Sequence, residues 1–157
     1  MILDALLEFD ISTGVAITVT RDSTNILDMA AQRDMGVGDF TLAILVSIIT
    51  AFTAAGAATL TTEVKASADN VTYYSLASTI AEAVANLTIG RQLARWPLPL
   101  FDEVAANSGL NAPRYYKLTY TVATGPMTAG TIAAYLTGHE SRDANRPYAK
   151  GFDTSQI

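Results

Sequence analysis

One group of residues near the carboxyl end of this chain could on paper bind a metal ion. The one histidine is His139, and it is followed by Glu140 and Asp143. A metal site needs these side chains to converge on one point. Adjacent residues of a strand point to opposite faces of a sheet, so His139 and Glu140 are not predicted to converge. We therefore expect a solvated cluster of charges here and no metal site.

Residues for covalent or acid–base catalysis lack the context that such chemistry requires. His139 can be combined on paper with a serine and a carboxylate, but no nucleophile elbow accompanies it. Asp102 and Glu103 are neighbours in a predicted loop, whereas the two carboxylates of a glycosidase come from facing elements. The chain has no phosphate loop, dinucleotide fingerprint or zinc spacing, and no cysteine. We expect neither an enzyme nor a cofactor.

Aromatic side chains offer a different chemistry, the stacking of sugar rings. The candidates are Tyr73, Tyr74, Trp96, Tyr115, Tyr116, Tyr120 and Tyr135. Aromatic residues are enriched in cores and interfaces as well, and that is the role we expect for most of them. A carbohydrate-binding β-sandwich that attaches to a host surface, with Trp96 as the stacking platform, remains an alternative function.

Composition narrows the class of protein. The chain has 157 residues, which suits one domain with a core of its own. Half of the residues are hydrophobic and 16% are charged, so the body is not predicted to be disordered. The net charge is −5, and the cations before the carboxyl-terminal segment are scattered singly. Nucleic-acid binding needs several cations on one surface, so no nucleic-acid partner is expected.

An uncharged stretch at residues 40–62 is long enough to cross a bilayer but does not have the pattern of a helix. Its even positions from Phe40 to Ile48 are large and apolar, whereas its odd positions are smaller or more polar. A period of two is typical of a strand. After a turn at residues 53–56 the alternation resumes, which predicts a long hairpin with one buried face and no membrane partner.

The rest of the chain also has the pattern of short strands. Further strands are predicted at residues 15–20, 25–29, 73–79 and 92–98, and a second long hairpin is predicted over residues 116–136. Residues 80–87 have mixed signals and are predicted to be strand or ordered loop. About eight strands separated by turns indicate an all-β fold, an antiparallel β-sandwich of jelly-roll type.

Both ends of the chain differ from this body. Residues 1–10 are an apolar and acidic arm, which could pack on its own domain or on a neighbour. They include Asp4 and Glu8 and no basic segment, so no secretory signal is predicted and the cytoplasm is the expected compartment. Residues 11–139 form the predicted sandwich domain. Residues 140–157 are a polar, extended arm that carries Arg146, Tyr148 and Phe152.

Several stretches resemble the jelly-roll capsid cement, or decoration, proteins of tailed bacteriophages. They are Met1-Ile2-Leu3-Asp4-Ala5, Asn25-Ile26-Leu27-Asp28, Arg33-Asp34-Met35-Gly36-Val37-Gly38, Ala51-Phe52-Thr53-Ala54-Ala55-Gly56-Ala57, Leu98-Pro99, Tyr115-Tyr116-Lys117-Leu118-x-Tyr120, Gly125-Pro126-x-Thr128-Ala129-Gly130 and Asn145-Arg146-Pro147-Tyr148-x-x-Gly151-Phe152. The opening five residues and the two Thr-Ala-Gly segments are the most specific. Residues 80–95 depart from the family's pattern.

The resemblance implies a virion protein on the outer surface of an icosahedral capsid, made in the cytoplasm of a host bacterium. Its partners would be the major capsid protein and other copies of itself, with a dimer favoured and a trimer as the alternative. It would bridge neighbouring capsid subunits and hold the shell against the pressure of packaged DNA. The contacts we expect for the capsid or for self-association are Met1, Leu3, Leu6, Phe9, Arg146, Tyr148 and Phe152.

Overall fold

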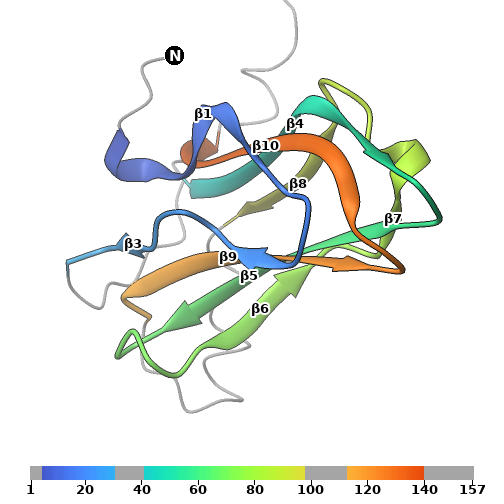
Figure 1. Ribbon diagram of the computed structural model, residues 1–157. Helices are drawn as coiled ribbons and strands as arrows, with labels where there is room; N and C mark the ends of the chain where they lie inside the picture. The colour runs from blue at the N-terminus through green and yellow to red at the C-terminus, as the bar shows by residue number, and fades with distance from the viewer. Residues whose placement is uncertain (1–4, 31–40, 98–112, 140–157) are drawn as a thin grey trace, which may run out of the picture.

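The computed structural model describes residues 5–30, 41–97 and 113–139, and in these ranges the protein is an all-β sandwich of two antiparallel sheets (Figure 1). Sheet A has the order β1-β10-β4-β8, with β1 at Glu8–Ala16, β10 at Met127–His139, β4 at Thr41–Ala54 and β8 at Gln92–Pro97. Short 3-10 turns lie at Ala5–Leu7 (η1) and Val84–Asn86 (η2).

Sheet B forms the second layer, which lies below sheet A in Figure 1. Its order is β2-β9-β5-β6, with β2 at Arg21–Asp22, β9 at Tyr115–Ala123, β5 at Thr59–Ser67 and β6 at Tyr74–Ser78. Two short strands complete it: β3 at Leu27–Asp28 pairs with β9, and β7 at Glu82–Ala83 pairs with β5. No helix in the described ranges is long and apolar enough to cross a membrane.

The core between the sheets confirms the inward positions that the alternation predicts. Ile44, Val46 and Ile48 of β4 are at most 1% exposed. Leu60 and Val64 of β5 are equally buried and face them from the other sheet. Period-two alternation buries one face of each strand, and two such faces pack together in a sandwich.

The prediction that residues 40–67 form a hairpin is wrong. β4 pairs with β10 and β8 in sheet A, whereas β5 pairs with β9, β6 and β7 in sheet B. The second predicted hairpin fails in the same way, because β9 lies in sheet B and β10 in sheet A. Alternation identifies a strand and its buried face, but it does not identify the strand that supplies its hydrogen bonds. In this protein both of the predicted hairpins, β4 with β5 and β9 with β10, instead cross from one sheet to the other.

The two crossings lie side by side at one end of the sandwich. Met127 is aligned with Ala54 in sheet A, and Ala123 is aligned with Thr59 in sheet B. The Thr53 and Thr128 hydroxyls form a hydrogen bond of 2.8 Å between the two similar Thr-Ala segments. The similar segments therefore lie mainly on the paired ends of β4 and β10, next to the two turns that join the layers.

Other boundaries differ from the predicted ones by a few residues. β1 begins at Glu8, so the last three residues of the predicted amino-terminal arm belong to the sandwich. The strand predicted at residues 15–20 ends at Ala16, because residues 17–20 turn towards sheet B. Residues 80–87 combine the short strand β7 with the 3-10 turn η2.

Candidate interaction surfaces

The predicted contact residues fall into three groups. Leu6 lies on η1 with 82% of its surface exposed, so it is accessible to a partner. Phe9 is fully buried in the core of its own domain, so its predicted contact with a partner is wrong for this fold. The remaining predicted contacts lie outside the described residues; they are Met1, Leu3, Arg146, Tyr148 and Phe152.

Phe9 is buried because β1 contains an irregularity at this point. The register of β1 against β10 shifts between Glu8, which is aligned with Tyr135, and Asp10, which is aligned with Ala134. Such a bulge places two consecutive side chains on the same side of a strand. Phe9 and Asp10 are both fully buried, and Glu8 points to the outer face.

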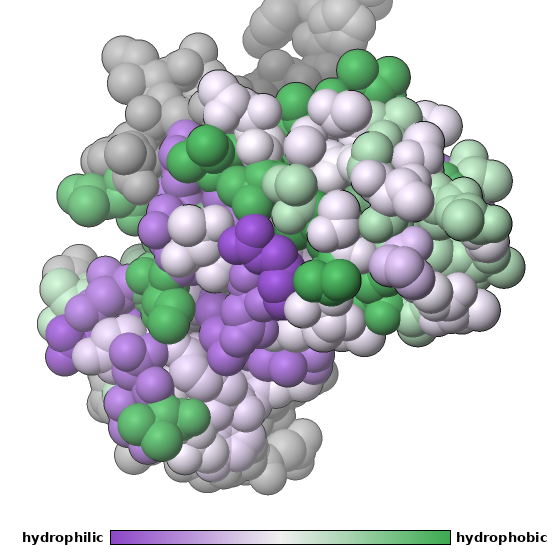
Figure 2. Space-filling model, in the orientation of Figure 1, coloured by the Kyte–Doolittle hydropathy of each residue, from purple (hydrophilic) through white to green (hydrophobic). Residues whose placement is uncertain are grey.

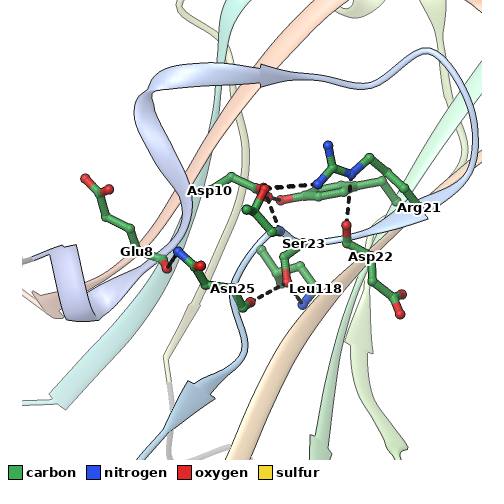
Figure 3. A network of polar contacts seen from close by, with 9 residues as sticks. Glu8, Asp10, Arg21, Asp22, Ser23, Asn25 and Leu118 are labelled. Atoms are coloured by element: carbon green, nitrogen blue, oxygen red, sulfur yellow. Dashed lines mark hydrogen bonds and ion pairs between the residues drawn. The ribbon is translucent and has the colours of Figure 1, made fainter.

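A buried carboxylate fastens this end of β1 to the opposite sheet. One Asp10 oxygen accepts hydrogen bonds from the Thr24 backbone amide at 2.9 Å and from the Thr24 hydroxyl at 2.7 Å. The other accepts a hydrogen bond of 2.6 Å from the Tyr120 hydroxyl, and the Arg21 guanidinium lies 3.8 Å from the first oxygen (Figure 3). We call Asp10, Arg21, Thr24 and Tyr120 the Asp10 latch. Buried carboxylates require such partners, and this one links β1 of sheet A to β9 of sheet B.

Burial and the neighbouring carboxylate also change the acidity of the phenol. Tyr120 is fully buried, and burial raises its pKa well above the ordinary value. The charge of Asp10 and the hydrogen bond to it raise the pKa further. The phenol is therefore neutral and remains a hydrogen-bond donor at physiological pH.

The free edge of β1 is covered at the latch. The backbone amide of Asn25 donates to the Phe9 carbonyl at 2.9 Å, and its side-chain amide donates to the Glu8 carbonyl at 3.0 Å. Figure 3 shows the Asn25 side chain turned towards β1 and the Glu8 carboxylate turned away from the latch. Because these carbonyls already accept hydrogen bonds, this part of the edge is not open to another strand.

A shallow groove lies beside the covered edge. Its lining residues are Leu6, Glu8, Thr24, Asn25, Ile26 and Leu27. Ile26 is 45% exposed, so the groove and Leu6 together present apolar surface next to the amino-terminal end. Figure 2, in the orientation of Figure 1, shows polar residues gathered over the middle of the molecule, near β2, with apolar residues around them.

The outward face of sheet B is charged and internally paired. Lys117 forms an ion pair of 2.8 Å with Asp22, and Arg114 forms one of 2.6 Å with Asp28. Partial burial acts to raise the pKa of Asp22, but hydrogen bonds from Lys117 and Thr119 outweigh it and lower the pKa. These charges satisfy one another and leave a solvated surface.

Three of the aromatic candidates for sugar stacking already have contacts within the protein. Trp96 is aligned with the inward-pointing Ile44 and packs against the core. The Lys117 ammonium lies 4.2 Å from the centre of the Tyr73 ring, and the Arg114 guanidinium lies 4.8 Å from the centre of the Tyr115 ring. Cations therefore already occupy a position over both of these rings.

The residues considered for metal binding lie at the end of the described residues or beyond it. β10 ends at His139, and Glu140 and Asp143 lie outside the described residues. Among the residues that were placed, no group of three histidine, cysteine or carboxylate side chains could hold a metal ion.

Sequence reasoning did not identify the Asp10 latch, because it placed Asp10 at the end of an arm. One signal was available: Asp10 stands between the apolar residues Phe9 and Ile11. Its partners are far away in the sequence, however, and Tyr120 is 110 residues distant.

The sandwich matches a known protein family. The family model described as Bbp16 matches residues 11–136, which is most of the chain and nearly all of the sandwich. A search of curated proteins finds no match.

Proposed function

This chain belongs to the Bbp16 family, and we propose that it is a structural virion protein without catalytic activity. In this proposal it binds the outside of an icosahedral phage head and cements neighbouring major capsid subunits. It acts as a homo-oligomer, with a dimer favoured, and stabilises the shell against the pressure of packaged DNA.

The strand order supports the finer assignment of a jelly roll. The chain alternates between the two sheets from β4 to β5 and again from β8 through β9 to β10, and β1 of sheet A pairs with β10, the last strand in the described ranges. Two Greek keys wound together produce this alternation in a double-sheet jelly roll. The resulting body is stiff, because the long strands β4 and β10 pair over most of their lengths.

The observation that carries the proposal is the position of Leu6. This large apolar side chain is 82% exposed at the amino-terminal end, yet the strand that follows it is fixed by the buried Asp10 latch. An exposed leucine on a fixed support offers a partner surface a preorganised apolar anchor. The resemblance to cement proteins begins at the same end, with the first five residues.

Cementing requires contacts that are individually weak but act together. A rigid body holds the anchors at fixed separations, so several of them can engage neighbouring capsid subunits at once. Linked contacts of this kind increase the overall affinity without a large body interface. A shell whose subunits are bridged in this way expands or opens only when several contacts break together.

Co-sedimentation with mature, undecorated heads of the parent phage tests the proposal. We expect saturable binding at a fixed number of copies per shell. Leu6→Ser should weaken binding by about ten- to a hundredfold, because a buried leucine contributes about 1.5–3 kcal/mol. Its thermal unfolding should stay close to that of the unchanged protein.

Ile80→Ser is the matched control, because Ile80 is 77% exposed at the distant start of the β7 segment. We expect it to bind heads as the unchanged protein does. Removal of residues 148–157 should also weaken attachment while leaving unfolding nearly unchanged. No binding of the unchanged protein to expanded heads would refute the capsid proposal, and a glycan array would then test the carbohydrate alternative.

A further inference from the structure

The outward face of sheet A has few charges for a sheet surface. Its central strands present Ala43, Leu45 and Ser47 on β4, and Ala133, Tyr135 and Thr137 on β10. These positions alternate with the inward residues of the same strands, and none of them is charged. Ala43 and Ala133 are buried, whereas the other four remain partly exposed.

Sheet B provides the comparison within the same molecule. Its outward face carries Glu63, Lys65 and Lys117, all of which form ion pairs. A sheet face that contacts water normally has such polar and charged residues. The centre of sheet A lacks them, which is typical of a surface that contacts another protein.

The charges of sheet A stand at its two edges, in one row. Glu8 on β1 is aligned with Tyr135, Tyr135 is aligned with Leu45, and Leu45 is aligned with Arg95 on β8. Residues aligned across neighbouring strands share one face, so all four point outward. Three strand spacings separate Glu8 from Arg95, about 14 Å, which is too far for an ion pair within one copy.

The two edge charges of this row have no ion-pair partners among the described residues. Neither the Arg95 guanidinium nor the Glu8 carboxylate forms an ion pair with a residue that the structure describes. A group of opposite charge from another molecule would therefore give each of them a partner.

A two-fold axis brings these features together. If the axis runs parallel to the strands between β10 and β4, it places the outward faces of two copies against each other. Tyr135 then lies opposite Leu45 of the other copy, and Glu8 lies opposite Arg95 of the other copy. The contact repeats by symmetry, so the two edge charges of each copy both acquire partners.

We propose that the outward face of sheet A binds a second copy of this chain, with two Glu8–Arg95 ion pairs flanking a centre of Leu45 and Tyr135. The edge charges of one copy are complementary to those of a second copy related by the two-fold axis. This complementarity favours a second copy of the chain as the partner. This face would mediate the self-association proposed above, and the inference therefore rests on that proposed function. Its test uses no capsids, so its failure would leave capsid binding open.

Sedimentation velocity over a range of concentrations tests the proposal, with the charges exchanged in turn. Glu8→Arg and Arg95→Glu each place two like-charged pairs in the interface. We expect each to raise the dimer dissociation constant by about tenfold or more. The double variant restores opposite charges in reversed order, so its dissociation constant should return to near that of the unchanged protein.

Two further variants separate the interface from folding. Leu45→Asp places a charge at the centre of the face and should give a monomer with an unchanged strand signal in circular dichroism. Exchange of Glu63 and Lys65, an ion pair on the outward face of sheet B, is the matched control and should leave the dimer intact. If Arg95→Glu does not fold, Arg95→Gln removes the charge without reversing it and should also weaken the dimer.

Three results would overturn the proposal. The first is an unchanged protein that stays monomeric at every concentration. The second is a dimer that the single charge exchanges and Leu45→Asp leave unaffected. The third is a double exchange that remains as weak as the single ones, since a true pair must be rescued by reversal.

Discussion

Removing the Tyr120 hydroxyl tests whether the Asp10 latch stabilises the sandwich. Tyr120→Phe keeps the ring in the core but deletes the 2.6 Å hydrogen bond to Asp10, a carboxylate that is fully buried. A hydrogen bond to a charged group contributes about 1.5–3 kcal/mol, and the oxygen left behind has no access to water. We therefore expect the free energy of unfolding to fall by about 1.5–3 kcal/mol.

Thermal and urea unfolding followed by circular dichroism measure this loss. For a domain of this size, each kcal/mol shifts the melting temperature by about 2–4 °C, so the expected decrease is about 3–12 °C. Tyr74→Phe is the control, because Tyr74 is partly exposed on β6, which is separated from β9 and the latch by β5. It should change stability by less than about 0.5 kcal/mol.

Hydrogen exchange locates the effect. The Thr24 backbone amide donates to the Asp10 carboxylate, so its exchange should become faster in Tyr120→Phe than in the control. A variant with unchanged stability and unchanged protection of Thr24 would refute the reasoning. It would mean that Arg21 and Thr24 hold Asp10 equally well without the phenol.

The remaining predictions concern a close contact and two titrations. Gly130→Ala should destabilise the protein by about 2–4 kcal/mol in urea unfolding, because φ is +134° and an added Cβ would lie 2.3 Å from the Phe52 ring. Gly56→Ala is the control, because an added Cβ at Gly56 would meet no neighbour within 4 Å. A comparable loss of stability in Gly56→Ala would contradict the steric explanation. Hydrogen bonds from the Thr72 and Val71 amides and from the Ser67 hydroxyl lower the pKa of Asp69 from 3.8 to about 2. The contribution of Asp69 to stability is therefore present above pH 3.8 and is lost as the pH falls towards 2. In Asp69→Asn the free energy of unfolding should change less steeply with pH between 3.8 and 2. An unchanged slope would contradict the role of Asp69. Tyr120 has a raised pKa, so stability should be retained below the ordinary value of 10.0 and lost above it, and an absorbance titration that ionises Tyr120 in the folded protein near pH 10 would contradict this.

The sequence predicted the strands well because alternation is a local property. Ile44, Val46 and Ile48 were predicted to point inward, and they are buried. A period of two fixes which side of a strand is apolar wherever the strand lies. Two antiparallel sheets and a core from their inner faces follow from the same pattern.

The candidate surfaces were predicted only in part. Leu6 and Phe9 were both predicted to contact a partner. The structure places Leu6 at the surface and Phe9, the second residue of β1, in the core. The difference comes from a bulge whose position depends on the register with β10, a strand from the other end of the chain. No local pattern records such a register.

The sequence by itself determined an all-β chain without cysteine, with buried faces set by the alternation of apolar residues. Only the tertiary structure decided that β4 and β5 separate into different sheets, that Tyr120 meets Asp10, and that Glu8, Tyr135, Leu45 and Arg95 form one row. The physical reason is distance along the chain. Burial preference is carried by each residue and its neighbours, whereas pairing depends on the packing of strands that are far apart in sequence.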